Sequence, residues 1–549
     1  MKPPEIVNAT QAELDELLAR AKPTFTSEQY LLLERVLATF VYVMGSLQSA
    51  KASIKRLQHM LFGQRTEHKH HVLGALTVAG QPQTLEVDAT DRAPDPDVPA
   101  VSTPRRARLL GHGRNAAQAY TSAPIVACNH LEMASGDRCP KCGQGRVYAC
   151  PPRSIVKVVG QAPLGATVYQ VERLRCRLCD TVFTAPLPAA AAALPKYDAT
   201  CASMIALLRY GSGVPHYRLE GLQASLYMPL PDATQWDIVS RAAAAPRAAF
   251  EELIRQAAQA PLLHHDDTPM KVLSLMAARA RAEADGVKPA AKAINTSGIV
   301  AVLNEDDPPR KVVLFFTGHA HAGTNLERVL ARRAQALQPA LQMCDALASN
   351  IVGEFKTLLG NCLTHGRRQV VDIAEQFPEA ARCVIEALAL VYQHDATCRQ
   401  DKLCAQQRLV FHQEHSSPVM EKLHGWMDAQ FDQRLVEPHS ALGKALRYLI
   451  RHWDALTLFL RQAGAPLDNN LCERALKRAI LHRKGSMFYK TPNGAQVGDI
   501  YMSLIHTCTL CGVNPFDYLN ALQRHAPAVM DHAAQWLPWN YHEQLAAGP

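Results

Sequence analysis

The sequence predicts a multidomain protein with an α/β core, and three observations lead to this fold class. The chain has 549 residues, too many for one compact domain, and 48% of them are hydrophobic, which is ample for buried cores. From about residue 262, short β-branched runs alternate with helical patterns, as in an α/β layer. Upstream of that layer lie a heptad repeat and two cysteine pairs, so we expect separate N-terminal domains.

A heptad repeat in residues 27–62 predicts a coiled-coil helix within an N-terminal region, residues 1–70. Thr26 and Gln29 match a capping box at its start, and Gly63 supplies a stop. We expect this seam to drive self-association; the alternative is a long amphipathic helix packed on its own chain. The two apolar rows of the seam are Leu33, Phe40, Leu47, Ile54 and Leu61, and Val36, Val43, Ala50 and Leu57.

Two Cys-x-x-Cys pairs in residues 105–190 predict a structural zinc ribbon. Cys139 and Cys142 form the first pair, Cys176 and Cys179 form the second, and β-rich runs lie between them. Four thiolates on two such knuckles, carried on hairpins, supply the tetrahedral ligands that Zn²⁺ prefers. A redox pair and free buried thiols are the alternatives.

The remaining regions are distinguished by composition and periodicity. A proline-rich linker is expected at 71–104, and short helices at 191–250 are compatible with a helix-turn-helix-like DNA-binding region. The α/β layer is expected in two parts, 251–360 and 461–549, with a mostly helical segment at 361–460 between them.

Within the first part of the layer, short apolar runs predict the strands. SGIVAVLN at 297–304 and KVVLFFTG at 311–318 are β-branched and bounded by turn residues. LLHHDDTP, from residue 262, and ALQMCDALAS, from residue 340, are short apolar runs that end in carboxylates. Acids at the ends of strands can form a site at the edge of a sheet.

The charge balance and the cysteine content indicate the class of partner and the cellular compartment. Lys plus Arg number 58 and Asp plus Glu 50, a net charge of +8, which is a mild bias toward polyanions. The 15 cysteines do not resemble a secreted disulfide framework, and we see neither a signal-peptide layout nor an apolar run of about 18 residues. We therefore expect a cytoplasmic protein that does not enter a membrane.

The stretch DNNLCERALKRAILHRKG at 468–485 places a single acid, Glu473, in a strongly basic segment. One interpretation is structural, because Asn470 and Glu473 match a capping box at the start of an amphipathic helix. The other is functional: the acid binds a metal and the cations contact a nucleic-acid backbone. Those cations are Arg474, Lys477, Arg478, Arg483 and Lys484.

Several motifs together resemble the IS sixty-six family of insertion-sequence transposases, over nearly the whole chain. They are HDDTP at 265–269, CLTHGRRQVVDIAEQFP at 362–378, PLDNNLCERALKRAILHRKGSMF at 466–488 and NGAQVGDIYMSLIHTCTLCGVNPFDYL at 493–519, with HMLFGQRTEH, the paired cysteines and GVPHYRLEGL in matching order. Asp267 stands where the family has Glu, and Gly485 where it has Asn.

The resemblance implies an RNase H-like catalytic core interrupted by a helical insertion, and DDE chemistry on DNA. Asp266, Asp345 and Glu473 would then be the catalytic acids and the ligands of Mg²⁺ or Mn²⁺, cutting the element's ends and joining them to target DNA. From chemistry alone, the choice between Asp266 and Asp267 stays open. His264 and His265 are expected as supporting neighbours rather than ligands.

The sequence and the family resemblance also suggest DNA contacts, partners and alternative functions. Arg367 and Arg368, beside His365, could contact DNA or form the solvated start of a helix. The family also implies DNA ends and target as partners, a homo-oligomer, and accessory proteins from the same element. The alternative functions are a catalytically inactive zinc-ribbon DNA-binding protein derived from a transposase, and a nuclease or resolvase that cuts without joining.

Overall fold

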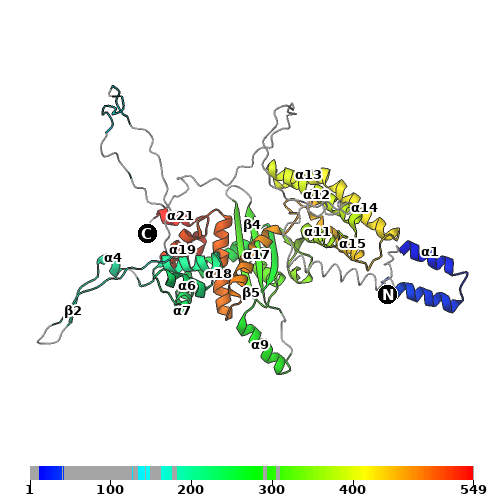
Figure 1. Cartoon of the computed structure of the whole chain (residues 1–549), viewed down its shortest axis with the longest axis horizontal. Helices are drawn as coiled ribbons and strands as arrows, with labels where there is room; N and C mark the ends of the chain where they lie inside the picture. Colours follow the sequence, from blue (N-terminus) through cyan, green and yellow to red (C-terminus); the bar gives the residue numbers. More distant parts are fainter. Residues whose placement is uncertain are drawn as a thin grey trace, which may run out of the picture. The chain divides into compact units, whose positions relative to one another are not determined.

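The computed structural model describes residues 11–39, 41, 127, 134–142, 144–148, 162–175, 182–193, 195–287, 293–304 and 309–547 (Figure 1). The chain divides into two compact units, Met1–Pro82 with Leu164–Pro549, and Gln83–Pro163. The larger unit is a mixed α/β structure built on one five-stranded sheet. No helix in the described part of the chain is long and apolar enough to cross a bilayer.

The five-stranded sheet has the order β5-β4-β3-β6-β7. β3, β4 and β5 form an antiparallel meander, and β6 and β7 run parallel to β3. The predicted strands are confirmed, while β7, a short strand with a glycine, had no distinctive pattern. The strands are β3 (Leu262–Pro269), β4 (Asn295–Asn304), β5 (Arg310–Gly318), β6 (Ala340–Cys344) and β7 (Thr357–Asn361).

Helices on both faces bury the sheet. α17 (Asn470–Ser486) packs on β3 and β4 and lies beside the strands in Figure 1. α10 (Ala322–Leu330) contacts the same two strands from the opposite face. Its start binds Asp267, whereas α17 contacts Gly298, which pairs with Asp266. Because Asp266 and Asp267 are neighbours on a strand, they point to opposite faces of the sheet. α9 (Leu273–Ala284) leaves the end of β3, and η3 (Ala348–Asn350) follows β6.

The free edge of β5 is covered by α18 (Pro492–Leu510), a helix with three polar side chains at four-residue intervals. Asp499, Ser503 and Thr507 accept the outward N–H groups of Thr317, Phe315 and Val313 at 2.7, 2.9 and 3.0 Å. An exposed strand edge can pair with strands of other chains. These three side chains bind the backbone N–H groups of β5 and so prevent such pairing.

Short helices before the sheet share its core, as Ile205, Leu219 and Val239 pack in one cluster with the strands, α17 and α18. This confirms the expectation of short helices in this region. They are α4 (Ala189–Ala192), α5 (Ala199–Ala206), the π-helix η2 (Leu207–Gly211), α6 (His216–Ser225), α7 (Asp232–Arg241) and α8 (Ala244–Ala258). α19 (Pro515–Arg524), α20 (Ala526–Asp531), η5 (Ala533–Gln535) and α21 (Tyr541–Ala547) follow α18.

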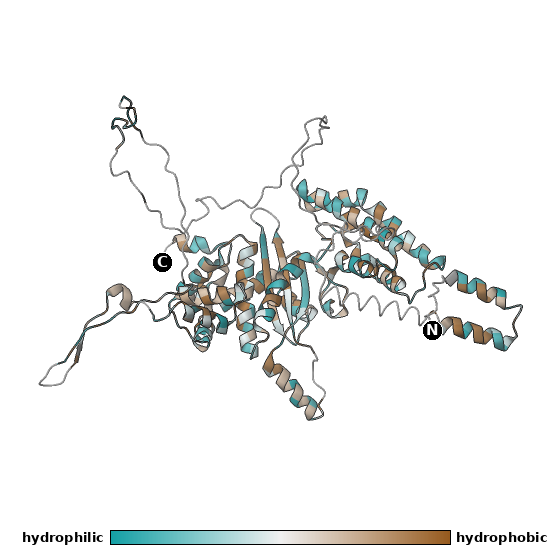
Figure 2. Cartoon of the chain, in the orientation of Figure 1, coloured by the Kyte–Doolittle hydropathy of each residue, from teal (hydrophilic) through white to brown (hydrophobic). Residues whose placement is uncertain are grey.

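The segment between β7 and α17 is mostly helical, as predicted, and has its own apolar core. That core reaches the sheet through Leu341 and Met343. Its longer helices alternate between hydrophobic and hydrophilic residues (Figure 2). The elements are α11 (Leu363–Val371), α12 (Pro378–Gln400), α13 (Ala405–His415), α14 (Ser417–Asp432), α15 (Ala441–Arg451), α16 (Trp453–Leu456) and η4 (Leu458–Leu460).

The N-terminal expectations are tested in part. After α1 (Gln11–Ala21) a second helix covers 27–39, and its predicted capping box is confirmed: Thr26 N–H donates to Gln29 at 3.1 Å, and Gln29 N–H to Thr26 at 3.4 Å. Most of the heptad seam, with Gly63, lies outside the described residues. Coiled-coil pairing stays a prediction.

Candidate active site

The first two candidate acids lie where the pairing between β3 and β6 ends. β3 pairs with β6 only as far as His264, which lies opposite Met343. Asp266 follows two residues later on β3, and Asp345 comes directly after β6. Continuing the parallel register therefore carries Asp266 and Asp345 to the same end of the two central strands.

The pKa of Asp266 is raised to about 7, mainly by burial. A hydrogen bond from the Asp267 N–H, 2.8 Å from Oδ1, opposes this shift, and the negative charges of Asp345 and Glu473 add to it. Both carboxylates therefore lie within electrostatic reach of Asp266. Acids at the end of β6 and on α17 therefore influence the acid on β3.

Asp267 points to the opposite face and is fully engaged there. Its Oδ1 accepts from Ser297 Oγ at 2.6 Å, and its Oδ2 accepts from the Ala322 N–H at 3.0 Å and lies 3.1 Å from His321 Nδ1. Since Ala322 begins α10, Asp267 caps that helix. Asp266 and Asp267 are thus separated by the alternation of a strand.

The start of α17 is fixed by Asn469, which the sequence offers as a helix cap but not as a tertiary contact. Its side chain donates to the His265 carbonyl at 3.0 Å and lies 3.2 Å from His264 Nδ1, and its N–H donates to Cys362 Sγ at 3.2 Å. These contacts join the helix to β3 and to the residue after β7. In the sequence, the pair of asparagines at 469–470 is the feature that could have indicated this role.

The predicted capping box between Asn470 and Glu473 is wrong. Asn469 is the N-cap residue and its side chain does not cap the helix, while Asn470 donates to Asp468 at 2.7 Å. The hydrogen bonds of Asn469 with His265 and Cys362 determine where the helix starts, and the local pattern of Asn470 and Glu473 does not. The Glu473 carboxylate is left facing the site, and its Oε1 is buried without a hydrogen-bond partner.

Gly298 lets α17 approach the sheet closely. It lies opposite Asp266 on β4, and a β-carbon there would come within 2.9 Å of Leu476 Cδ2 and 3.5 Å of Cys472 Sγ. A larger residue would push the helix, and with it Glu473, away from Asp266.

The loop that carries Asp345 is held by asparagines. Asn350 Nδ2 donates to Asp345 Oδ1 at 2.6 Å, and the Leu347 N–H donates to the same oxygen at 3.1 Å. Asn361, at the end of β7, donates to the Asp345 carbonyl at 3.3 Å. The position of this acid is therefore set by two strands and one turn.

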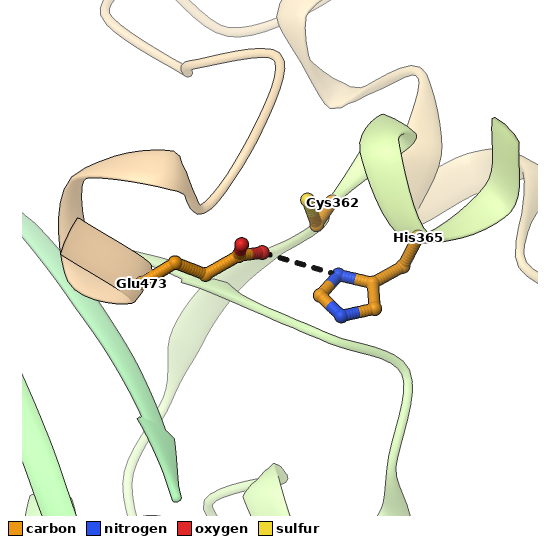
Figure 3. Close-up of side chains that lie close together, drawn as sticks. All are labelled: Cys362, His365 and Glu473. Carbon is orange, nitrogen blue, oxygen red and sulfur yellow. Dashed lines mark ion pairs between the residues drawn. The ribbon is translucent and has the colours of Figure 1, made fainter. Parts of the chain in front are cut away.

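Cys362, His365 and Glu473 lie close together (Figure 3). His365 Nδ1 is 3.7 Å from Glu473 Oε1. Within the described residues, these three have ligand atoms all within 4.8 Å of one another, whereas the three acids do not form so close a group. Burial raises the pKa of the Cys362 thiol to about 11, and its Sγ accepts the Asn469 N–H at 3.2 Å.

His264 and His265 are buried on β3, and burial lowers their pKa values to about 4 and about 3. Both rings are neutral at physiological pH. His264 contacts Asn469, and Gln342 lies 2.9 Å from His265 Nε2. They support the strand ends, in line with the expectation from sequence.

The cations of α17 separate into two groups. Arg474, Lys477 and Lys484 are exposed on one side of the helix and are called the basic stripe below. Arg478 donates to the Gly211 carbonyl at 2.9 Å, and Arg483 to Thr268 at 3.2 Å and to the Pro269 carbonyl, so both are committed within the protein. Arg367 and Arg368 are half-buried on α11.

The first cysteine knuckle forms a tight turn. The Cys139 N–H donates to the Gly145 carbonyl at 2.8 Å, and the Gly145 N–H donates to Cys142 Sγ at 3.5 Å. Backbone N–H groups, that of Gly145 first, lower the pKa of the exposed Cys142 thiol, which favours its thiolate form. Cys176 and Cys179 lie outside the described residues, between β1 (Arg173–Arg175) and β2 (Val182–Thr184), which pair antiparallel.

Comparison with known proteins agrees with this arrangement. Uncharacterized protein y4hP of Sinorhizobium fredii is 22% identical over 514 residues, covering 90% of this chain and 89% of that protein. Uncharacterized protein y4jD of the same organism is 26% identical over 383 residues, covering 67% of this chain and 71% of that protein. The model of the Transposase IS66 family matches residues 196–497, which include the sheet, the helical insertion and all three acids. The chain belongs to the IS66 family of transposases.

Proposed function

We propose that this protein is a DNA transposase that cuts the ends of its insertion sequence and joins them to target DNA, with Asp266, Asp345 and Glu473 as ligands of Mg²⁺ or Mn²⁺. One observation carries the proposal. Asp345 and Glu473, from distant parts of the sequence, lie within electrostatic reach of Asp266, and the Glu473 Oε1 is buried without a hydrogen-bond partner. Such an arrangement is unfavourable unless a cation compensates it.

The sheet supports assignment of an RNase H-like core. In sequence order its strands are arranged 3-2-1-4-5, with the second antiparallel to the first. On this assignment the first acid lies on the first strand, the second acid follows the fourth, and the third acid lies on a helix beyond the insertion. The contacts of Asp267 with Ser297 and the start of α10 favour Asp266 over Asp267 as the ligand.

The donor set suits a hard divalent cation. Mg²⁺ favours carboxylate oxygens and retains waters and substrate phosphates as further ligands. Bound metal would lower the barrier by aligning and activating oxygens at the phosphodiester.

The remaining groups hold the acids and the DNA. Asn469 fixes the start of α17, Asn350 orients Asp345, and β3 provides the rigid position of Asp266. The basic stripe begins one residue after Glu473 and would hold the phosphate backbone beside the acids. A zinc ribbon with Cys139, Cys142, Cys176 and Cys179 as ligands would add a second contact with DNA.

The test is Glu473→Gln in the full-length protein, assayed on DNA that carries the element's own ends. This change removes the negative charge and keeps the shape, so DNA binding should persist while Mg²⁺-dependent cleavage falls by at least about 100-fold. Glu386→Gln, an exposed glutamate on α12, is the matched control and should cleave normally. Cleavage by Glu473→Gln at the control rate would remove Glu473 from the mechanism. Cutting without joining, by the unmodified protein, would instead indicate a nuclease.

A further inference from the structure

A second feature of α17 lies at the opposite end of the helix from Glu473. There a pocket of about 600 Å³ opens between the starts of α6 and α7 and the turn that joins α17 to α18. Its lining includes Arg209, Tyr217, Trp236, Met487, Phe488 and Tyr489, and it is called the aromatic pocket below. None of these residues takes part in the proposed metal chemistry.

The aromatic pocket has flat rings in its walls. Tyr217 is 58% exposed, with the Arg218 guanidinium 5.6 Å from its ring centroid, and Trp236 is half-buried. Behind them the rings of Tyr489, His482 and Tyr210 form a stack, with centroids 4.6 and 6.2 Å apart and interplanar angles of 17° and 18°. The pKa of His482 is lowered to about 3 by burial, so this backing is neutral and rigid.

The guanidinium of Arg209 lies beside the aromatic rings of the pocket. Arg209 is buried, its guanidinium lies 5.8 Å from the centroid of the Tyr210 ring, and it donates to Ser486 Oγ. Its Nε is buried and has no hydrogen-bond partner. A buried donor without an acceptor is costly, and a ligand with an acceptor atom would relieve that cost.

The rim of the pocket is strained. Met487 ends α17 with φ of 68°, a left-handed conformation that an unbranched side chain rarely adopts, and it is 65% exposed. An apolar side chain held outward at such a position can insert beside an unstacked base. Asp232, also on the rim, offers an acceptor for exocyclic amino groups.

The basic stripe connects the aromatic pocket to the acids. Arg474, Lys477 and Lys484 follow the exposed side of α17 from Glu473 toward Ser486, a distance of about 20 Å along the helix axis. Lys490 adds a further exposed cation at the pocket. A phosphate backbone on this stripe would bring a nucleotide to the pocket mouth.

We propose that the aromatic pocket captures one unpaired nucleobase of the DNA strand whose backbone lies along the basic stripe. The inference rests on the proposed DNA-transposase function and adds a base-specific subsite to it. A paired base presents only its edges, whereas an unpaired base can stack on Tyr217 and Trp236 and accept from Arg209. The pocket volume accommodates a base with its sugar.

The experiment compares two short duplexes of the same sequence, one fully paired and one with a single extrahelical 2-aminopurine. Both are titrated with full-length Glu473→Gln protein, which removes cleavage from the measurement. We expect tighter binding of the bulged duplex and quenching of the 2-aminopurine fluorescence as it stacks. Adding Tyr217→Ala should weaken binding of the bulged duplex about tenfold and abolish the quenching. Binding of the paired duplex should change little.

Two further variants separate stacking from folding. Tyr217→Phe keeps the ring and should restore both the preference and the quenching. Tyr227→Ala removes a tyrosine that is 94% exposed and outside the pocket, so it should behave as the parent protein. Equal affinity of the parent for both duplexes, or equal losses in Tyr217→Ala and Tyr227→Ala, would overturn the inference and leave the carboxylate chemistry intact. Normal cleavage by Glu473→Gln would instead reject that chemistry without affecting this binding result.

Discussion

Asp266 and Asp267 are neighbours on β3 with opposite surroundings, and this contrast defines the site at the scale of single residues. Asp267 accepts from Ser297 and Ala322 and stabilises the start of α10. Asp266 is half-buried within electrostatic reach of two other acids, and its pKa is raised to about 7. One acid contributes to stability, whereas the other lowers the stability of the metal-free fold.

We predict opposite effects of substituting these two neighbours. Asp266→Asn should abolish cleavage and raise the free energy of unfolding of the metal-free protein, by about 2 kcal/mol near pH 8, because a buried charge is removed. Asp267→Asn should retain cleavage and lower the free energy of unfolding by about 1–2 kcal/mol, because an amide would face the Ala322 N–H. Denaturant titrations in chelator, with parallel cleavage assays, measure both. Loss of cleavage in Asp267→Asn with full activity in Asp266→Asn would reverse the assignment.

The sequence alone could name both acids but could not choose between them. Strand alternation separates their directions, yet only the tertiary partners reveal which direction faces α17. The same limit explains the failed capping box. Asp468, Asn469 and Asn470 are all good capping residues, and the contact between Asn469 and the His265 carbonyl decides their roles.

At the scale of elements, α18 and β5 illustrate how polar side chains complete a sheet edge. Asp499 accepts from the Thr317 N–H at 2.7 Å and from the Thr317 hydroxyl at 2.7 Å, yet burial raises its pKa to about 7. A raised pKa means that the folded state binds the proton more tightly than the unfolded state. Its contribution to stability is therefore greatest below the unfolded pKa of 3.8 and is lost as the pH rises toward about 7.

Asp499→Asn should flatten this pH dependence. Because Asp266 titrates in the same window, the comparison is made in an Asp266→Asn background, and the free energy of unfolding is measured from about pH 4 to pH 8. The parent should lose stability across that range, and the variant should lose less, since the amide can still bond with Thr317. An unchanged slope would show that Asp499 has an ordinary pKa.

Elements with a strong pattern were predictable, and those defined by tertiary contact were not. The β-branched runs gave β4 and β5, and helical spacing gave the insertion, α17 and its neighbours. β7 is a five-residue strand with an unremarkable composition, and its place beside β6 depends on pairing. The π-helical turn at Leu207–Gly211 likewise has no local signature.

At the scale of the whole molecule, the chain combines an α/β unit that carries the candidate acids with segments expected to bind DNA and to self-associate. The helical insertion separates Asp345 from Glu473 in sequence, yet both lie within electrostatic reach of Asp266. The motifs and their order indicated this arrangement through family resemblance. Composition and periodicity alone would have given only an α/β layer.

Cys139→Ser should release the zinc and weaken DNA binding more than it slows cleavage of bound DNA, because the knuckle lies in a region separate from the acids in sequence. Zinc content by mass spectrometry and DNA affinity by anisotropy measure the two effects. Cys404→Ser, at the exposed cap of α13, is the control and should keep its zinc, since serine caps helices well. Zinc retained by Cys139→Ser would reject the ribbon.

The most direct test of the central claim is a crystal structure with Mn²⁺, in which anomalous scattering locates the ion. We predict a peak about 2 Å from carboxylate oxygens of Asp266, Asp345 and Glu473 together. A peak bound instead by Cys362 and His365, or the absence of any peak between the three acids at saturating Mn²⁺, would contradict the proposed chemistry.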